Sequence, residues 1–188
     1  MRILSKRTLA EGVLLTFEQL VLAGDEGETV RDVIRHPGGV GVLPVEGEDV
    51  YLVVQHRAAL GADVAEIPAG RLEPGENADP ESAARRELEE EIGARAGRMI
   101  HLATSHPSPG YTDEVLELYA ALELTWVGRR PEGWEERHLQ VERMPFEEAV
   151  RRIGDGRISD AKTQVALLAW KELLRTGLVL EHGKEGTK

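Results

Sequence analysis

The segment from residue 79 to residue 93 constrains the fold of this chain most, because it carries the start signals, the stop signal and the periodicity of an amphipathic helix. Asp79 is a helix-capping residue type, Pro80 suits the first helical position, and Gly93 is typical of a helix end. Apolar residues recur one turn apart along it: Ala84, Leu88 and Ile92. Such a helix must bury that strip, so we predict that it docks on a sheet.

The other side of the same helix is acidic, with the sequence ARRELEEEIG at residues 84–93. Glu87 and Glu91 lie one turn apart on one face, and Glu90 lies beside them. Like charges at this spacing cost about 0.2–0.5 kcal/mol per pair. Arg86 offsets only part of that repulsion. From the residues alone, the face is either solvated or gathered around a cation.

Strand-like runs on both sides of the helix predict an α/β fold. Residues 13–17, 19–22 and 29–35 indicate a small antiparallel sheet at the N-terminus. Further strand patterns cover residues 40–45, 50–54, 98–104, 115–124 and 138–144, and helical patterns cover 145–153 and 160–174. In the last helix we predict an apolar stripe of Val165, Leu168, Ala169 and Leu173.

The composition bounds the organisation and the class of protein. A chain of 188 residues fits one principal domain, and we divide it into an N-terminal β-region (1–37), a main domain (38–178) and a polar tail (179–188). A formal charge of −11 argues against a nucleic-acid binder, and no apolar run is long enough to cross a membrane. With no cysteine and no export signal, we expect a cytoplasmic protein.

Two stretches of the sequence resemble the Nudix box. The first runs from Gly70 to Glu76 and reads GRLEPGE, and the second runs from Arg86 to Ala94 and reads RELEEEIGA. Nine residues separate Glu76 from Arg86, two more than in the family pattern. Because the extra pair precedes the helix start, it lengthens a turn and leaves the helix register unchanged.

The resemblance implies an α/β/α sandwich with a mixed sheet, preceded by the small antiparallel β-region, and a site for divalent cations. The ligands that it implies are the carbonyl of Ala69 and the carboxylates of Glu87, Glu90 and Glu91. Oxygen ligands of this kind suit Mg²⁺ or Mn²⁺. Glu76 and Arg86 would brace the loop against the helix.

The same resemblance implies hydrolysis of a nucleoside diphosphate linked to a second group. The catalytic set that it implies is Glu90 and Arg86, with a loop glutamate as base, Glu136 first and Glu135 second. One of the helical glutamates is the alternative base.

Three further segments are similar to the ADP-ribose pyrophosphatase branch: residues 55–57 with 66–70, residues 108–114 and residues 160–163. The substrate-binding residues that this branch implies are Arg57, Glu66, Ser108, Pro109, Gly110, Asp113 and Glu114. It also implies a homodimer. Taken alone, Arg57 is consistent with a surface arginine, Glu66 with a structural carboxylate and the segment 108–114 with a tight loop.

Two alternatives to ADP-ribose hydrolysis stay open. Another nucleoside diphosphate sugar such as GDP-mannose is one, because Gln55, Arg57 and the Pro68–Gly70 segment are shared with that group. A non-catalytic ligand sensor on the same fold is the other. The intact set of Glu87, Glu90 and Glu91 favours an enzyme.

Overall fold

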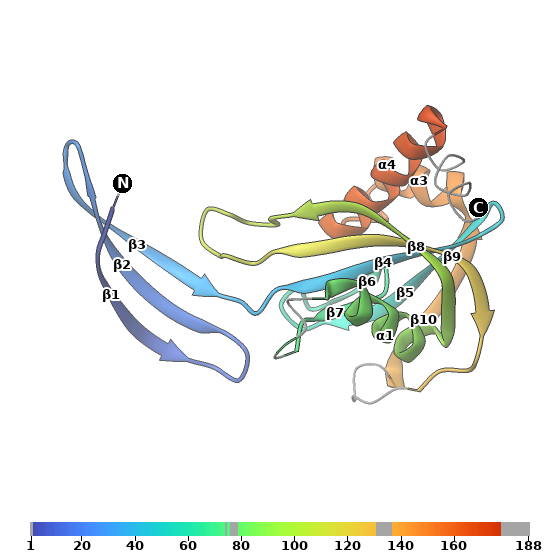
Figure 1. Cartoon of the computed structure of the whole chain (residues 1–188), viewed down its shortest axis with the longest axis horizontal. Helices are drawn as coiled ribbons and strands as arrows, with labels where there is room; N and C mark the ends of the chain where they lie inside the picture. The colour runs from blue at the N-terminus through green and yellow to red at the C-terminus, as the bar shows by residue number, and fades with distance from the viewer. Residues whose placement is uncertain (1, 74, 76–78, 131–136, 178–188) are drawn as a thin grey trace, which may run out of the picture.

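The computed structural model describes residues 2–73, 75, 79–130 and 137–177. Its strands form two separate sheets (Figure 1). The first sheet, which we call the arm, contains β1 (Arg2–Glu11), β2 (Thr16–Gly24) and β3 (Gly27–Arg35), paired antiparallel in that order. The arm projects away from the rest of the molecule, which confirms the predicted N-terminal antiparallel sheet.

The arm differs from the sequence prediction in where its first strand lies. Residues 13–17 were predicted as one strand, but only Thr16 and Phe17 belong to β2. The backbone N–H of Gly12 donates to the carbonyl of Leu15 at 2.8 Å, which closes a turn over the apolar residues between them. β1 itself mixes charged and apolar residues without alternation, so pairing with β2 rather than a local pattern defines it.

The second sheet has seven strands among the described residues. They are β4 (Gly39–Glu46), β5 (Asp49–Arg57), β6 (Ala62–Glu66), β7 (Ala69–Arg71), β8 (Ala94–Ser105), β9 (Leu116–Trp126) and β10 (Gln140–Pro145). The order is β10-β5-β4-β9-β8, with β6 beside β5 and β7 beside β4. β4 and β9 run parallel and the other neighbours antiparallel, so the sheet is mixed, as predicted.

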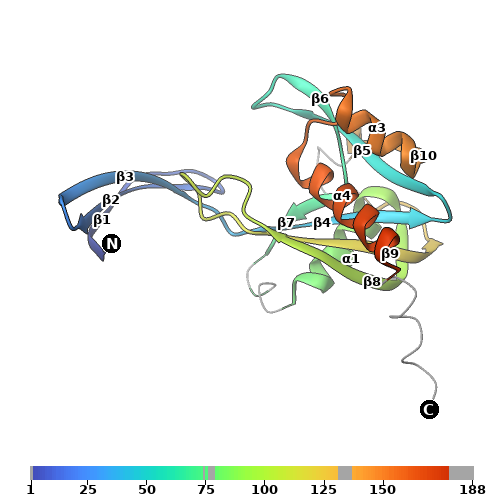
Figure 2. The same ribbon diagram turned by 90° about the horizontal axis from the view of Figure 1, so that it is seen from above.

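Helices cover both faces of this sheet (Figures 1 and 2). α1 (Pro80–Ile92) lies on one face, and α3 (Phe146–Gly154) and α4 (Ala161–Thr176) lie on the other. Alternate residues of β4 serve the two cores, with Val42 packed on the α1 side and Leu43 on the α4 side. The α/β/α sandwich is therefore confirmed. No helix in the described ranges is long and apolar enough to span a membrane.

The boundaries of α1 follow the signals in the sequence. The Asp79 side chain accepts a hydrogen bond from the backbone N–H of Ser82 at 3.2 Å, and Gly93 ends the helix with a left-handed φ of 75°. A side chain at position 93 would also collide with the backbone of Arg129, at 2.5 Å. The predicted strip of Ala84, Leu88 and Ile92 is buried against the sheet.

The buried stripe of α4 is rotated from the predicted one. Its buried residues are Thr163, Ala166, Leu167 and Trp170, whereas the predicted Leu168 is 50% exposed. Val165 and Leu173 pack at the edge of the core. The cause is at the N-terminus of the helix, where the Thr163 hydroxyl donates to the Asp160 cap and accepts from the backbone N–H of Ile67. Those two polar bonds fix which face turns inward.

Adjacent leucines on α4 give a direct test of this packing. Leu167→Ala should lower the free energy of unfolding by about 2–5 kcal/mol, because it opens a cavity in the core. Leu168→Ala removes the same atoms from an exposed position and should change stability by about 0.5 kcal/mol or less. Urea unfolding followed by tryptophan fluorescence measures both variants. Equal losses would contradict the observed face of α4.

Candidate functional site

A cavity of about 780 Å³ lies where α1, the strands β4, β5 and β7, and the start of α4 meet. Residues with charged side chains on its wall are Arg57, Arg71, Glu73, Arg86, Glu87, Glu90, Glu91, Glu114, Asp160 and Lys162. Both signs of charge therefore face one space. These charged residues come from five separate segments of the chain.

The three glutamates of α1 stand at one wall of this cavity and are almost completely buried. Glu87, Glu90 and Glu91 are 6%, 9% and 4% exposed. The backbone N–H of Ala69 donates to Glu91 Oε2 at 3.1 Å. At Gly70 the approach is closer still, because a Cβ there would lie 2.0 Å from Glu87 Oε1. Only glycine lets the β7 backbone lie this near the carboxylates.

Arg86 bridges the same carboxylates. Its Nη1 donates to Glu87 Oε1 at 2.7 Å and to Glu90 Oε2 at 3.1 Å, and its Nη2 reaches the carbonyl of Arg71 at 3.5 Å. Arg86 thus contacts both the helix and β7, which is the bracing position that the sequence resemblance implied.

The chemistry of these donors fits a hard divalent cation. Three carboxylates and the backbone of β7 would supply oxygen ligands, and the cavity leaves room for water and for phosphate oxygens. In the described part of the chain, no three Asp, Glu, His or Cys side chains already converge as a metal-binding group. Glu87 and Glu90 turn toward Arg86, and Glu91 turns toward the Ala69 N–H.

A second wall of the cavity carries cations held by a buried acid. Arg57 donates to both oxygens of Glu66, at 2.7 and 2.6 Å, and Lys162 contacts the same carboxylate and that of Asp160. Burial acts to raise the pKa of Glu66, but the bond from Arg57 and the charge of Lys162 outweigh it, so the pKa lies below its ordinary value. Glu66 is 1% exposed and stays ionised.

The sequence resemblance implied that Glu66 binds substrate, whereas its contacts in the structure are with Arg57 and Lys162. Lys162 was not singled out as a site residue. The available signal was its place two residues after Asp160, whose capping bond to the Thr163 N–H sets the first turn of α4. That turn brings Lys162 to the carboxylate of Glu66 at the end of β6. No local pattern in the sequence shows this contact.

The segment 108–114 contributes to the site unevenly. Glu114 lines the cavity. Ser108, Pro109 and Gly110 form a turn in which the Ser108 carbonyl accepts from the N–H groups of Tyr111 and Thr112, at 3.2 and 3.1 Å. Asp113 is bonded to the end of β3. The remaining sequence candidates, Glu76, Glu135 and Glu136, fall outside the described residues.

Comparison with known proteins agrees with this architecture. An ADP-ribose pyrophosphatase of Bacillus subtilis (strain 168) is 33% identical over 184 residues, which cover 93% of this chain and 98% of the relative. A methanol dehydrogenase activator of Bacillus methanolicus is 38% identical over 138 residues, covering 73% and 74% of the two chains. The crystal structure of an ADP compounds hydrolase aligns with a TM-score of 0.80 at 23% identity, over 93% and 94% of the chains, and supports the fold.

The family model described as NUDIX domain matches residues 35–165, which include α1, its glutamates and the whole cavity wall except Leu14. With that match and a relative at 33% identity over nearly the full length of both proteins, the chain belongs to the NUDIX domain family.

Proposed function

We propose that this chain hydrolyses the diphosphate bond of ADP-ribose, giving AMP and ribose 5-phosphate, with Mg²⁺ or Mn²⁺ as cofactor. The observation that carries the proposal is the single cavity shared by three buried glutamates and two cations, Arg57 and Lys162. Carboxylates on one side suit metal ions, and guanidinium and ammonium groups on the other suit phosphate oxygens. An acidic protein thereby binds an anionic substrate.

Each side chain has a proposed task. Glu87, Glu90, Glu91 and the Ala69 carbonyl would hold the cation, which when bound neutralises phosphate charge and lowers the pKa of a water. Arg86 keeps Glu87 and Glu90 in place through its two bonds.

Arg57, fixed by Glu66, binds phosphate oxygens together with Lys162. Glu136, or Glu135 next, takes the proton of the attacking water, and Glu90 is the helical alternative.

Support for ADP-ribose as the substrate comes from the relative named ADP-ribose pyrophosphatase, which aligns over nearly its whole length. GDP-mannose remains the second candidate, because the shared Gln55, Arg57 and Gly70 all line the cavity. For Ser108, Pro109, Gly110, Asp113 and Glu114, a substrate-binding role stays a prediction, as does a cytoplasmic location. A sensor without catalysis would bind the same ligand and leave it intact.

We further propose that the protein is a homodimer formed through the arm, which would make residues 1–37 a dimerisation region. Apolar side chains exposed together on a sheet that packs on nothing else mark a surface for association. Here every described residue of β1 is exposed, and Ile3, Leu4 and Leu9 are 57%, 40% and 38% exposed. A second copy of the chain would cover them.

Removing the helical carboxylates should abolish catalysis. Glu90→Gln and Glu91→Gln should each reduce kcat on ADP-ribose by about 100-fold or more, because a neutral amide is a poor ligand for a divalent cation. Glu89→Gln is the matched control: this neighbour on α1 pairs with Arg95 at the surface, and its loss should leave kcat within about twofold. Excess EDTA should stop the wild-type reaction. Unchanged activity in Glu90→Gln would refute the metal site.

A substrate panel separates the candidate functions. We expect kcat/KM to be highest for ADP-ribose when it is compared with GDP-mannose, NADH and diadenosine polyphosphates under the same Mg²⁺ concentration. A higher value for GDP-mannose would reverse the substrate assignment. Tight binding of ADP-ribose by calorimetry with no release of AMP would favour the sensor.

The mass of the protein in solution tests whether the arm forms a dimer. Light scattering after gel filtration should give twice the chain mass of 20.7 kDa. Ile3→Asp with Leu9→Asp should produce the monomer, because a buried unpaired carboxylate is costly. Leu174→Asp, at a 49% exposed position of α4, should leave the dimer intact. A monomeric wild type would contradict the proposed interface.

A further inference from the structure

The end of the arm is bonded to the loop that carries Glu114. The Ile34 N–H donates to the Tyr111 carbonyl at 2.7 Å, and the Asp113 N–H donates to the Ile34 carbonyl at 3.3 Å, so that Ile34 and Thr112 form a parallel bridge. In Figures 1 and 2 the loop between β8 and β9 reaches out along β3. Backbone hydrogen bonds therefore connect the end of the arm to the loop at the rim of the cavity.

Asp113 is the centre of this junction. Its Oδ2 accepts from Arg35 Nη1 at 2.9 Å and its Oδ1 accepts from the backbone N–H of His36 at 2.9 Å. Both of its oxygens are thus engaged by the segment that joins the arm to β4. Although Asp113 precedes a cavity residue, these bonds direct its carboxylate away from the substrate space and toward the arm.

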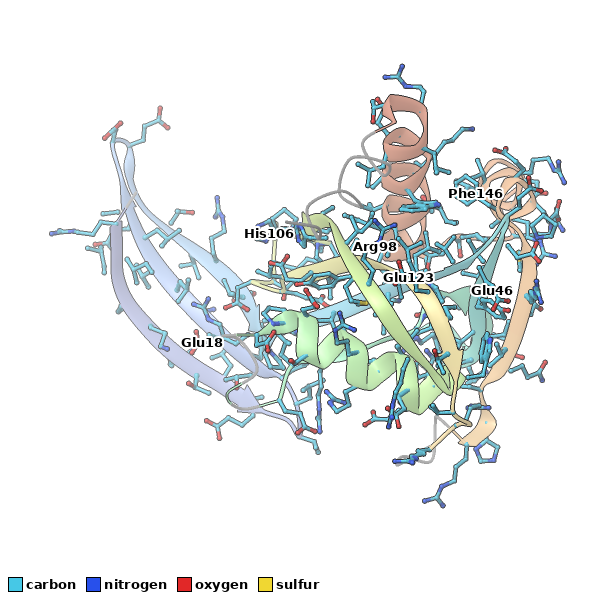
Figure 3. All side chains as sticks on the ribbon, turned by 45° about the vertical axis from the view of Figure 1, so that its right-hand side comes forward. Glu18, Glu46, Arg98, His106, Glu123 and Phe146 are labelled. Carbon is cyan, nitrogen blue, oxygen red and sulfur yellow. The ribbon has the colours of Figure 1, made fainter. Side chains whose placement is uncertain are left out.

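A buried acid fixes the arginine in turn. Arg35 Nε donates to Glu18 Oε2 at 2.7 Å, and Lys6 Nζ contacts Glu18 Oε1 at 2.8 Å. Glu18 is 4% exposed, although the sheet around it is largely open to solvent (Figure 3). Its two cationic partners cover this carboxylate and hold it in one position. Lys6, Glu18, Arg35 and Asp113 form a chain of ion pairs that spans all three arm strands and ends at the loop.

The residues on either side of the junction line the cavity. His36 follows Arg35, Glu114 follows Asp113, and His36 Nε2 lies 3.9 Å from Glu114 Oε1. A carboxylate with two acceptor oxygens is suited to the adjacent hydroxyl groups of a ribose. Whether the Glu114 carboxylate reaches such hydroxyl groups depends on where the backbone at residues 113 and 114 is held.

We infer that Asp113 and Arg35 are positioning residues, which hold Glu114 at the cavity rim so that it binds the sugar of the substrate. This inference rests on the proposed function for its substrate, and on the bonds above for its geometry. On this inference Asp113 acts through Glu114 in place of the direct substrate contact that the sequence resemblance implied for it, because both of its carboxylate oxygens are bonded to Arg35 and His36. The arm thereby contributes to substrate binding through the loop as well as to self-association.

The test compares steady-state kinetics on ADP-ribose with amide hydrogen exchange of the ligand-free protein. Asp113→Asn and Arg35→Gln should each raise KM by about three- to tenfold with kcat within about twofold, because sugar binding weakens while the chemistry is untouched. Asp113→Glu keeps the carboxylate, so its KM should stay closer to the wild-type value than that of Asp113→Asn. The double variant Arg35→Gln with Asp113→Asn should raise KM no further than Arg35→Gln alone, because both changes break one junction.

Arg31→Gln is the matched control, since this β3 arginine donates to the Thr29 hydroxyl and to the Val30 carbonyl within its own strand, and it should leave KM unchanged. In Asp113→Asn, the amides of residues 111–114 should exchange about tenfold faster than in wild type. Wild-type KM and exchange rates in Asp113→Asn would overturn the inference, as would a fall in kcat alone or an equal effect of Arg31→Gln. If wild type does not turn over ADP-ribose, the proposed function fails, and the exchange rates by themselves decide the positioning role.

Discussion

The contact between α1 and β7 is the constraint on which the rest of the site depends. Gly70 lets the β7 backbone come so near to Glu87 that no side chain would fit between them. The Ala69 N–H and Arg86 then fix Glu91, Glu87 and Glu90 relative to that backbone. A helix and a short strand are thereby joined through carboxylates, which also face the cavity. Burying these acids is favourable only with partners, and the same geometry suits a cation.

The wall of the cavity that carries Arg57 and Lys162 follows a similar principle, but here a buried acid holds two cations. Glu66 is buried and ionised, and it orients Arg57 and Lys162 from two elements that are far apart in the chain. Since Glu66 holds two of the three guanidinium nitrogens of Arg57, the side chain loses little further freedom when it meets a phosphate group. Acidic side chains thus line one part of the cavity and basic side chains line another, and both sets are held in place before a ligand binds. The net charge of −11 therefore does not describe the electrostatic field inside the cavity.

The arm shows how a peripheral sheet can matter to a distant site. Its strands expose apolar side chains that suit a second copy, and its last residues bond to the loop at the cavity rim. Glu18 and Leu20 are the buried residues of the described arm, and two cations hold Glu18 in place. If the arm dimerises as proposed, subunit association and the position of Glu114 depend on the same strand, β3.

Local signals predicted α1, because its caps, its apolar strip and its acids all lie within residues 79–93. The resemblance carried by the spacing of Gly70 and the helical glutamates implied the mixed α/β class and the family. Contacts between distant segments are not encoded in such local patterns. The face of α4 depended on the bond between Thr163 and Ile67, 96 residues apart, and Lys162 entered the site through the same docking. The contacts of Asp113 likewise required β3, because bonds between distant segments leave no periodicity in either one.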